Sequence, residues 1–472
     1  MRSGLFALAL TSALFLGGCA FVPRDRGTHA IDAMLAERGA PAAEWKGGGD
    51  APLPSDALTL SQAIRLAFVR SPVIREQYAD LGIATADLRE AVQLPDIGLG
   101  YTRLASGGEA QVTRSLSLAF SELLLRHSRV SLADANYSMT RDRVAARLLA
   151  LESEVGASWF EYVAARQAAE VAQVSARAAR ASAEYARRLH AAGNLPPRAL
   201  AQEMAADSSA DIAAARAEAQ VQIARARFAA LVGLSVRDAW QVPARLPAMP
   251  ARDDLPANFA ERAFAARTDL AAAQRETEAL AQAFRAARAW RWLGDFEVGY
   301  ERETETDGAR LKGPTLHLTL PLFHWNRAGV LRAQSMLDGA RARRAALELG
   351  VRNDLSLGLD RLTTSRRIAE AYRNALVPQR EAIYARTLEE VNFMLAGAFE
   401  ALAARREQFA AYQEYLEATR DYWLAWLDLR RVSGGALAAP EDNSPLEVDA
   451  AAADATQDPA AKEAAHANGA HR

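Results

Sequence analysis

The chain has 472 residues, and its formal net charge of -2 gives no electrostatic reason to expect a nucleic-acid partner. Half of the residues are hydrophobic, but only 7% are aromatic, and Ala is abundant throughout. This balance is typical of extended helices with small-residue seams and argues against a set of ordinary globular domains.

The first residues have the features of a secretory signal. Arg2 precedes the apolar run Leu5–Leu16, which is too short to span a bilayer and is followed by two glycines and Cys19. This ending resembles the lipobox of bacterial lipoproteins, which implies that Cys19 is lipidated and becomes the new amino terminus. By the same resemblance, Ala20 favours delivery to the outer membrane. The alternative is an ordinary secretory signal with an incidental cysteine.

The segments on either side of Cys19 differ in their expected fate. Residues 1–18 are predicted to be a removed signal, and residues 19–57 an amino-terminal arm that is only partly ordered. Cys19 is the only cysteine, so no intramolecular disulfide can form. No later run of 18 apolar residues occurs, so the sequence predicts no transmembrane helix. A mature chain that crosses a membrane would therefore need strands in a closed barrel, because only then is every backbone N–H and C=O group paired.

The rest of the chain consists of two copies of one pattern. Residues 58–233 and 259–434 each predict a shorter helix, a strand pair, a helix of about 70 residues, a turn at a glycine and a returning helix. Residues 234–258 contain several prolines and predict a linker or a small equatorial element. Residues 435–472 predict a disordered tail.

Each copy opens with one predicted helix. In the first copy, Ser61 is the expected N-cap, and the helix is expected to end near Leu94, ahead of Pro95. The second copy begins alike when Arg70 is aligned with Arg267. Two strand pairs cannot close a barrel, and helices of about 70 residues cannot fit in a compact domain. The duplication therefore predicts a tubular oligomer that crosses a membrane and reaches far from it.

The predicted strands have the period of two that is typical of a membrane barrel with a wet lumen. Apolar side chains on one face alternate with small or polar side chains on the other, although a half-buried sheet in a soluble domain would show the same period. The position of the strand pairs between long helices favours the membrane interpretation. The polar, lumen-facing set of the second copy contains Glu297, Glu301, Thr315, His317 and Thr319.

Two roles remain open for the acidic members of this set. They would keep the lumen and the loops wet, or they would give the pore a preference for cations. His317 is interpreted as a polar lumen residue rather than as a metal ligand.

The long helices are predicted from about Leu123 to His190 and from about Arg327 to Leu395. At ~1.5 Å per residue each is roughly 100 Å long. Pro378 interrupts the second helix and predicts a kink or a local break. Gly193 and Gly397 are predicted to take left-handed backbone conformations at the two turns. Heptad-like spacing of Ala and Val predicts antiparallel coiled-coil pairs, and a solvated amphipathic bundle is the alternative.

Taken together, these features resemble the TolC family of outer-membrane efflux proteins. The resemblance covers about Leu58 to Val432 and is carried by Leu58-Thr59-Leu60-Ser61-Gln62-Ala63, by the strand and turn Gly313 to Phe323, and by the two turns. It implies a mainly α fold with a small β part. Long antiparallel coiled-coil hairpins would be joined to four β-strands per chain, and three chains would form a twelve-stranded β-barrel.

The resemblance also implies partners. Family members form homotrimers in outer-membrane lipid and dock on a periplasmic adaptor and an inner-membrane transporter. Contacts with the adaptor are expected at the two tips, which contain Gly193, Asn194, Gly397 and Ala398.

The segment beyond the second tip departs from the family pattern. Well-studied members narrow the closed tunnel with acidic residues at this point, whereas here Glu400 is the only acid before Arg405 and Arg406. These three residues are a candidate tunnel gate. The segment is closer to members associated with heavy-metal and copper resistance.

No motif indicates an enzyme. The chain has no phosphate-binding Gly-Lys-Ser/Thr loop, no His-Glu-x-x-His and no Gly-x-Ser-x-Gly, and no cofactor is expected. The expected function is a passive exit duct of a tripartite efflux pump in the outer membrane of a Gram-negative bacterium, with a large periplasmic part. The alternative is a lipid-anchored periplasmic coiled-coil adaptor or scaffold, although adaptors normally carry one hairpin rather than two.

Overall fold

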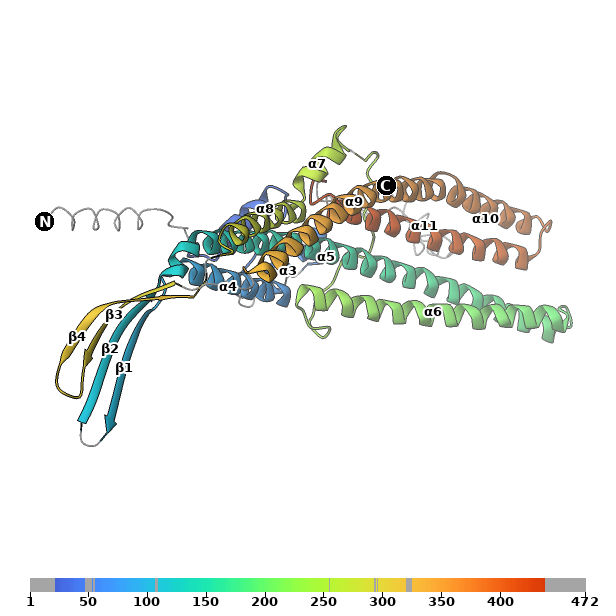
Figure 1. Ribbon diagram of the computed structural model, residues 1–472. Coiled ribbons are helices and arrows are strands. Elements are labelled where there is room, and N and C mark those ends of the chain that lie inside the picture. The colour runs from blue at the N-terminus through green and yellow to red at the C-terminus, as the bar shows by residue number, and fades with distance from the viewer. Residues whose placement is uncertain are drawn as a thin grey trace, which may run out of the picture. The chain divides into compact units, whose positions relative to one another are not determined.

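The computed structural model describes residues 22–46, 53, 56–106, 109–253, 255–292, 294, 296–319 and 325–437. Cys19, Leu320–Phe323 and most of the predicted tail lie outside these residues. The described elements are α2 (Thr28–Ala36), α3 (Leu60–Arg70), α4 (Pro72–Val92), β1 (Ile97–Ser106), β2 (Glu109–Ala119), α5 (Phe120–Ala191), α6 (Pro197–Val232), α7 (Phe259–Ala266), α8 (Thr268–Ala289), β3 (Phe296–Thr304), β4 (Arg310–Leu318), α9 (Arg327–Ala371), the π-helix η1 (Tyr372–Leu376), α10 (Val377–Asn392) and α11 (Ala398–Val432) (Figure 1).

The chain divides into two compact units, and each draws on both sequence copies. One unit takes in residues 1–34, 76–146 and 267–350, which include the four strands. The other takes in residues 35–75, 147–266 and 351–472, which include the ends of both long hairpins. The sequence repeats and the compact units are therefore different divisions of the chain.

The helix that opens each copy is broken in two, which corrects the prediction of one helix from Ser61 to about Leu94. In the first copy α3 ends at Arg70, and the next residue, Ser71, has the extended backbone that Pro72 imposes on its predecessor. In the second copy α7 and α8 meet at Arg267, which has ψ 108° although no proline follows it. With Arg70 aligned with Arg267, the two breaks lie one residue apart, at Ser71 and at Arg267.

The N-cap of α3 is Thr59 rather than the predicted Ser61. The Gln62 N–H donates to Thr59 Oγ1 at 3.4 Å, and the Thr59 N–H donates to Gln62 Oε1 at 3.0 Å, which completes a capping box. Leu60 is buried, so the helix starts where this side chain reaches the core.

The four strands form one antiparallel sheet in the order β1-β2-β3-β4. The strand pair of the first copy therefore lies beside that of the second, with β2 bonded to β3 from Val112↔Thr304 to Ala119↔Glu297. The strands are nine to eleven residues long and curve together (Figure 1).

The two long hairpins differ in continuity. In the first, α5 is unbroken over 72 residues and returns through α6, and the Arg180–Asp211 and Arg187–Asp207 ion pairs join the two antiparallel helices. In the second, the π-helix η1 separates α9 from α10, immediately before Pro378. The predicted local break is therefore a π-turn, in which the Val377 N–H donates to the Tyr372 carbonyl five residues earlier.

The linking segment 234–258 packs over the helices of its own unit. Trp240, Val242 and Leu246 are buried, and the Leu246 N–H donates to Gln167 Oε1 at 3.1 Å. Trp423 Nε1 of α11 donates to the Pro247 carbonyl at 3.0 Å. Within the described residues, no helix is both long and apolar enough to cross a bilayer.

Candidate functional site

One face of the sheet is apolar and largely open. The strand register aligns its side chains into continuous rows across all four strands, because residues two apart share a face. Most of these side chains are exposed although they are large and hydrophobic, which marks an interaction surface. The rows contain Ile97, Leu99, Leu116, Leu118, Val298, Tyr300, Pro314, Leu316 and Leu318.

The opposite face is polar and built from small residues. A Cβ added at Gly98 would come within 2.6 Å of Ser117 Oγ, and one at Gly299 would come within 2.5 Å of Thr315 Oγ1, so hydroxyls of the neighbouring strand cover these glycines. The register brings together four of the residues predicted for this face, because Glu297 lies opposite His317, and Glu301 and Thr315 belong to the same face. Thr319 is exposed just beyond the end of β4.

The first helical tip is a compact polar turn. Gly193 has φ 76°, as predicted, and the Asn194 N–H donates to the Leu189 carbonyl at 2.9 Å. His190 Nδ1 lies 2.7 Å from the Leu195 carbonyl and ties the two ends of the turn together.

The second tip is apolar, and its left-handed residue is not the predicted one. Gly397 has φ -85° and ψ 153° and serves as the N-cap of α11, whereas Met394 has φ 60°. The turn closes through the Leu395 N–H, which donates to the Glu390 carbonyl at 2.8 Å. Phe393, Met394 and Leu395 are 77%, 92% and 79% exposed. We call these three residues the apolar tip.

The residues predicted as a gate do not share one environment. Glu400 is exposed in the first turn of α11, whereas Arg405 is 6% exposed. The Arg405 guanidinium carbon lies 4.8 Å from the ring centre of Tyr384 and 4.6 Å from that of Phe409, so cation–π contacts hold this side chain between α10 and α11. Its charge is therefore directed into the hairpin.

Arg406 links the two hairpins near their tips. It donates to Glu203 of α6 at 3.2 Å, and Glu203 also accepts from the Ser182 hydroxyl of α5 at 2.6 Å. The Tyr185 and Phe399 rings, 5.7 Å apart, make a second contact between the hairpins.

A polar cluster fixes the linking segment against the second hairpin. Arg366 Nε donates to Asp253 Oδ2 at 2.7 Å, and the Tyr422 hydroxyl donates to Asp253 Oδ1 at 2.7 Å. Burial, followed by the hydrogen bond to the Asp253 carboxylate, raises the pKa of Tyr422 well above its usual value. This tyrosine therefore remains a neutral donor.

Solved structures with the same fold are outer-membrane channels. The Campylobacter jejuni CmeC outer membrane channel matches with a TM-score of 0.70 at 15% identity, over 84% of this chain and 92% of that one. The open state of the Neisseria gonorrhoeae MtrE outer membrane channel matches with a TM-score of 0.68 at 19% identity, over 81% and 90%. The chain has the TolC-type fold of outer-membrane efflux channels.

A characterised protein is similar in sequence. The cobalt-zinc-cadmium resistance protein CzcC of Cupriavidus metallidurans is 24% identical over 314 residues, which are 66% of this chain and 73% of that protein. No model of a known protein family matches the sequence. The predicted TolC-family resemblance and the mainly α fold class are confirmed. The similarity is to channel proteins rather than to enzymes, as the sequence led us to expect.

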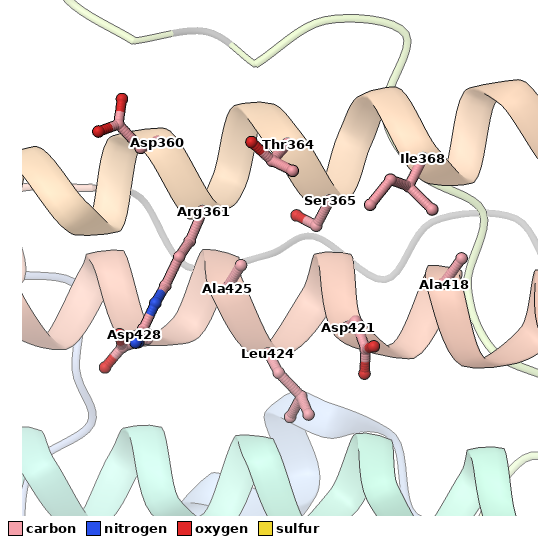
Figure 2. Close-up of a pocket in the computed structure, with 10 residues that line it drawn as sticks. All are labelled: Asp360, Arg361, Thr364, Ser365, Ile368, Ala418, Asp421, Leu424, Ala425 and Asp428. Atoms are coloured by element: carbon pink, nitrogen blue, oxygen red, sulfur yellow. Dashed lines mark ion pairs between the residues drawn. The ribbon is translucent and has the colours of Figure 1, made fainter.

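The structure of this chain also contains a groove that the sequence did not predict. It lies between α9 and α11, has a volume of about 620 Å³, and is lined by residues from Asp360 to Ile368 and from Ala418 to Asp428 (Figure 2). Arg361 Nη1 lies 3.6 Å from Asp428 Oδ2 across it, and Ile368 remains exposed at its edge. No sequence motif marks this groove, because it is formed by residues far apart in the chain.

Among the described residues, no three His, Cys, Asp or Glu side chains are grouped to hold a metal ion. His317 lies on the polar face opposite Glu297, in an exposed position. Its interpretation as a polar lumen residue stays a prediction.

Proposed function

We propose that the protein is the homotrimeric outer-membrane exit duct of a tripartite efflux pump. The observation that carries this proposal is the sheet, in which four strands have one exposed apolar face, one polar face of small residues, and two edges without a strand partner in the described chain. An apolar face suits contact with lipid, and the opposite face suits a wet lumen.

Closure of the sheet requires other copies of the chain. An open strand edge within lipid leaves backbone N–H and C=O groups unpaired, at several kcal/mol each, so β4 of one subunit must bond to β1 of the next. Two different edges meeting head to tail generate a ring. Strands of nine to eleven residues also match the length that crosses a bilayer at a tilt. Three subunits would give the twelve strands that the resemblance implies.

The helices of the unit that contains the hairpin ends also support a head-to-tail ring of subunits. Large apolar side chains remain exposed on α6, where they include Ile212 and Ile223, and on the α9–α10 side, where they include Ile368 and Ile383. These are two different surfaces, which again suits a head-to-tail ring. We assign the groove between α9 and α11 to the contact with a neighbouring subunit.

The tips are the proposed docking points for the periplasmic adaptor. Gly193, Asn194, Gly397 and Ala398 lie at or beside the turns, and the apolar tip adds three exposed hydrophobic side chains. Exposed apolar clusters of this kind are typical of protein interaction sites. The adaptor would connect the duct to an inner-membrane transporter.

The substrate class follows only from similarity. CzcC is named for resistance to cobalt, zinc and cadmium, so heavy-metal cations are the first class to test in an export assay. Glu297 and Glu301 would line the lumen and keep it wet.

Two measurements test the duct. The full-length protein in detergent should have the mass of a trimer, and its insertion into planar bilayers should give stepwise ion conductance. A stable monomer without conductance would contradict the proposal and would favour the lipid-anchored scaffold. A photo-crosslinking residue at Met394 should capture an adaptor in cells, whereas the same residue at exposed Arg386, away from the tip, should not.

A further inference from the structure

The charges of the sheet are completely separated between its two faces. Every Lys and Arg of the four strands lies on the same face as the apolar rows, and among the described strand residues no carboxylate lies there. The strand carboxylates Glu109, Glu297, Glu301 and Glu303 all lie on the opposite face, which has no Lys or Arg. We call the cationic set, Arg103, Arg114, Arg302, Arg310 and Lys312, the basic row.

The basic row lies at one end of the apolar face. Arg114 faces Arg302, and Arg302 faces Lys312, so three cations follow one another across three adjacent strands. Arg103 and Arg310 occupy the next rung toward the hairpin loops. All five side chains are exposed, and none enters an ion pair within the described chain.

This arrangement is unfavourable by itself. Like charges directly opposite each other on neighbouring strands destabilise a sheet. The glutamates of β2 and β3 lie on the opposite face, and β4 contains none, so no carboxylate of the strands compensates Arg114, Arg302 and Lys312. A row of cations without counter-charges therefore indicates that an anion is supplied from outside the chain.

We propose that the basic row binds phosphate groups of membrane lipids. The inference rests on the proposed function, which places the adjoining apolar rows in the hydrocarbon layer. A cation at the end of a strand that spans the bilayer then lies at the level of the lipid head groups. Guanidinium groups bind phosphate through paired hydrogen bonds, and four of the five cations are arginines. In the ring, each subunit would contribute its own basic row to a continuous girdle.

The opposite end of the apolar face has a different character. Trp290 and Trp292, with ring centres 6.2 Å apart, precede β3, and Trp325 follows the segment after β4. Tryptophan is typical of membrane interfaces in general and does not require an anionic lipid. The two interfaces would thus be fixed by different chemistry, aromatic at the helical end and cationic at the loop end.

The test uses the full-length trimer in neutral detergent, titrated with diphosphoryl lipid A or with zwitterionic phosphatidylcholine. Bound lipids are counted by native mass spectrometry. The wild type should prefer lipid A, and the preference should weaken as salt is added. The triple variant Arg114→Gln, Arg302→Gln, Lys312→Gln should lose about fivefold in lipid A affinity for each cation removed, on the order of 100-fold in all.

A matched triple variant, Arg198→Gln, Arg367→Gln, Arg386→Gln, removes the same charge from exposed positions on the helices and should bind lipid A as the wild type does. A conservative variant, Arg114→Lys with Arg302→Lys, keeps the charge and should fall between wild type and the glutamine triple, because the paired hydrogen bonds are lost. This variant also separates lipid binding from a folding defect.

Several outcomes would overturn the proposal. The first is equal binding of lipid A by the wild type and by the glutamine triple variant. The second is equal binding of lipid A and phosphatidylcholine by the wild type. The third is complete displacement of lipid A by inorganic phosphate at the same concentration as the lipid, which would indicate a site for free anions. Conductance in phosphatidylcholine bilayers is measured in parallel. If the wild type conducts ions but shows no lipid preference, only the proposal that the basic row binds lipid phosphate is refuted. If the wild type does not conduct ions, the proposed function as an exit duct is refuted.

Discussion

The two long hairpins follow one plan but differ in helix continuity and in the chemistry of their tips. The first has an unbroken helix α5 and a polar turn at Gly193. The second is interrupted by η1 and ends in the apolar tip. The two copies of the hairpin therefore differ in helix continuity and in the polarity of their tips.

The hairpins are held together through α5 and α11. The Phe160 and Trp423 rings stack with centres 5.1 Å apart and planes within 6° of each other. Arg430 of α11 donates to Glu152 of α5 at 2.9 Å, with the two side chains only 2% and 5% exposed. A buried ion pair contributes little net stability while intact, but removing one partner leaves a charge without compensation.

The largest expected effect comes from breaking this pair. Arg430→Met should destabilise the protein by about 3–5 kcal/mol at pH 8, because Glu152 would stay buried without its cation. Burial already raises the pKa of Glu152, and Arg430 opposes that shift. Without Arg430 the folded pKa rises further above the ordinary value of 4.5, so the folded state binds more protons than the unfolded state. The stability of the Arg430→Met variant should therefore fall as the pH rises from the ordinary pKa of a glutamate through the raised pKa of Glu152 in the folded state.

Thermal unfolding followed by circular dichroism between pH 5 and pH 8 measures the effect. The control is Arg431→Met, next in sequence, whose half-exposed side chain pairs with Asp428 and should cost no more than about 1 kcal/mol. Adding Glu152→Gln to Arg430→Met should remove most of the pH dependence. A loss that is the same at both pH values would mean that Glu152 is not the group left without compensation.

The second prediction concerns the difference in continuity. A π-turn inserts one residue into an α-helix, so deleting Asn374, which is exposed within η1, would restore an α-helical register. The ring of Pro378 would then clash with a carbonyl of the preceding turn, at about 3 kcal/mol. Combining the deletion with Pro378→Ala should recover most of this loss.

Melting temperatures of the single and double variants test this account. If the Asn374 deletion and the deletion combined with Pro378→Ala are equally stable, the packing of α10 on α11, rather than Pro378, causes the π-turn. In the duct, the double variant would give the second hairpin the continuity of the first.

The sequence was most informative where a single backbone period decides the structure. The alternation in β1–β4 predicted both faces of the sheet, and Gly193 and Pro378 predicted a turn and an interruption. It was least informative where packing chooses between similar residues. Thr59 and Ser61 are both good N-caps, and burial of Leu60 selects the first.

The same limit applies to charged and strained residues. The role of Arg405 in a gate stays a prediction, and the sequence did not reveal its burial between two aromatic rings, because only the folded hairpin brings them to it. A left-handed Met394 is unusual for a residue with a side chain, so the glycine three positions later was the natural choice. The basic row was also missed, because it emerges only when the register of all four strands is known.

The smallest expected effect separates the two tips by backbone conformation alone. A Cβ added at Gly193 or at Gly397 would meet no atom within 4 Å, so an alanine is sterically free at both positions. Only Gly193 has a left-handed conformation, which costs an L-residue about 1 kcal/mol. Gly193→Ala should therefore lower stability by about 1 kcal/mol, and Gly397→Ala should change it by less than about 0.5 kcal/mol.

Met394→Gly supplies the reciprocal test, because relieving φ 60° should stabilise the second turn by about 0.5–1 kcal/mol while removing the most exposed side chain of the apolar tip. This variant should melt at a higher temperature yet crosslink less well to the adaptor from a probe at Leu395. If Gly397→Ala instead costs as much as Gly193→Ala, the second turn uses Gly397 as its left-handed residue, and the two tips share one backbone design. A stabilised Met394→Gly variant with weaker docking would mean that the second tip retains backbone strain in order to present an apolar side chain.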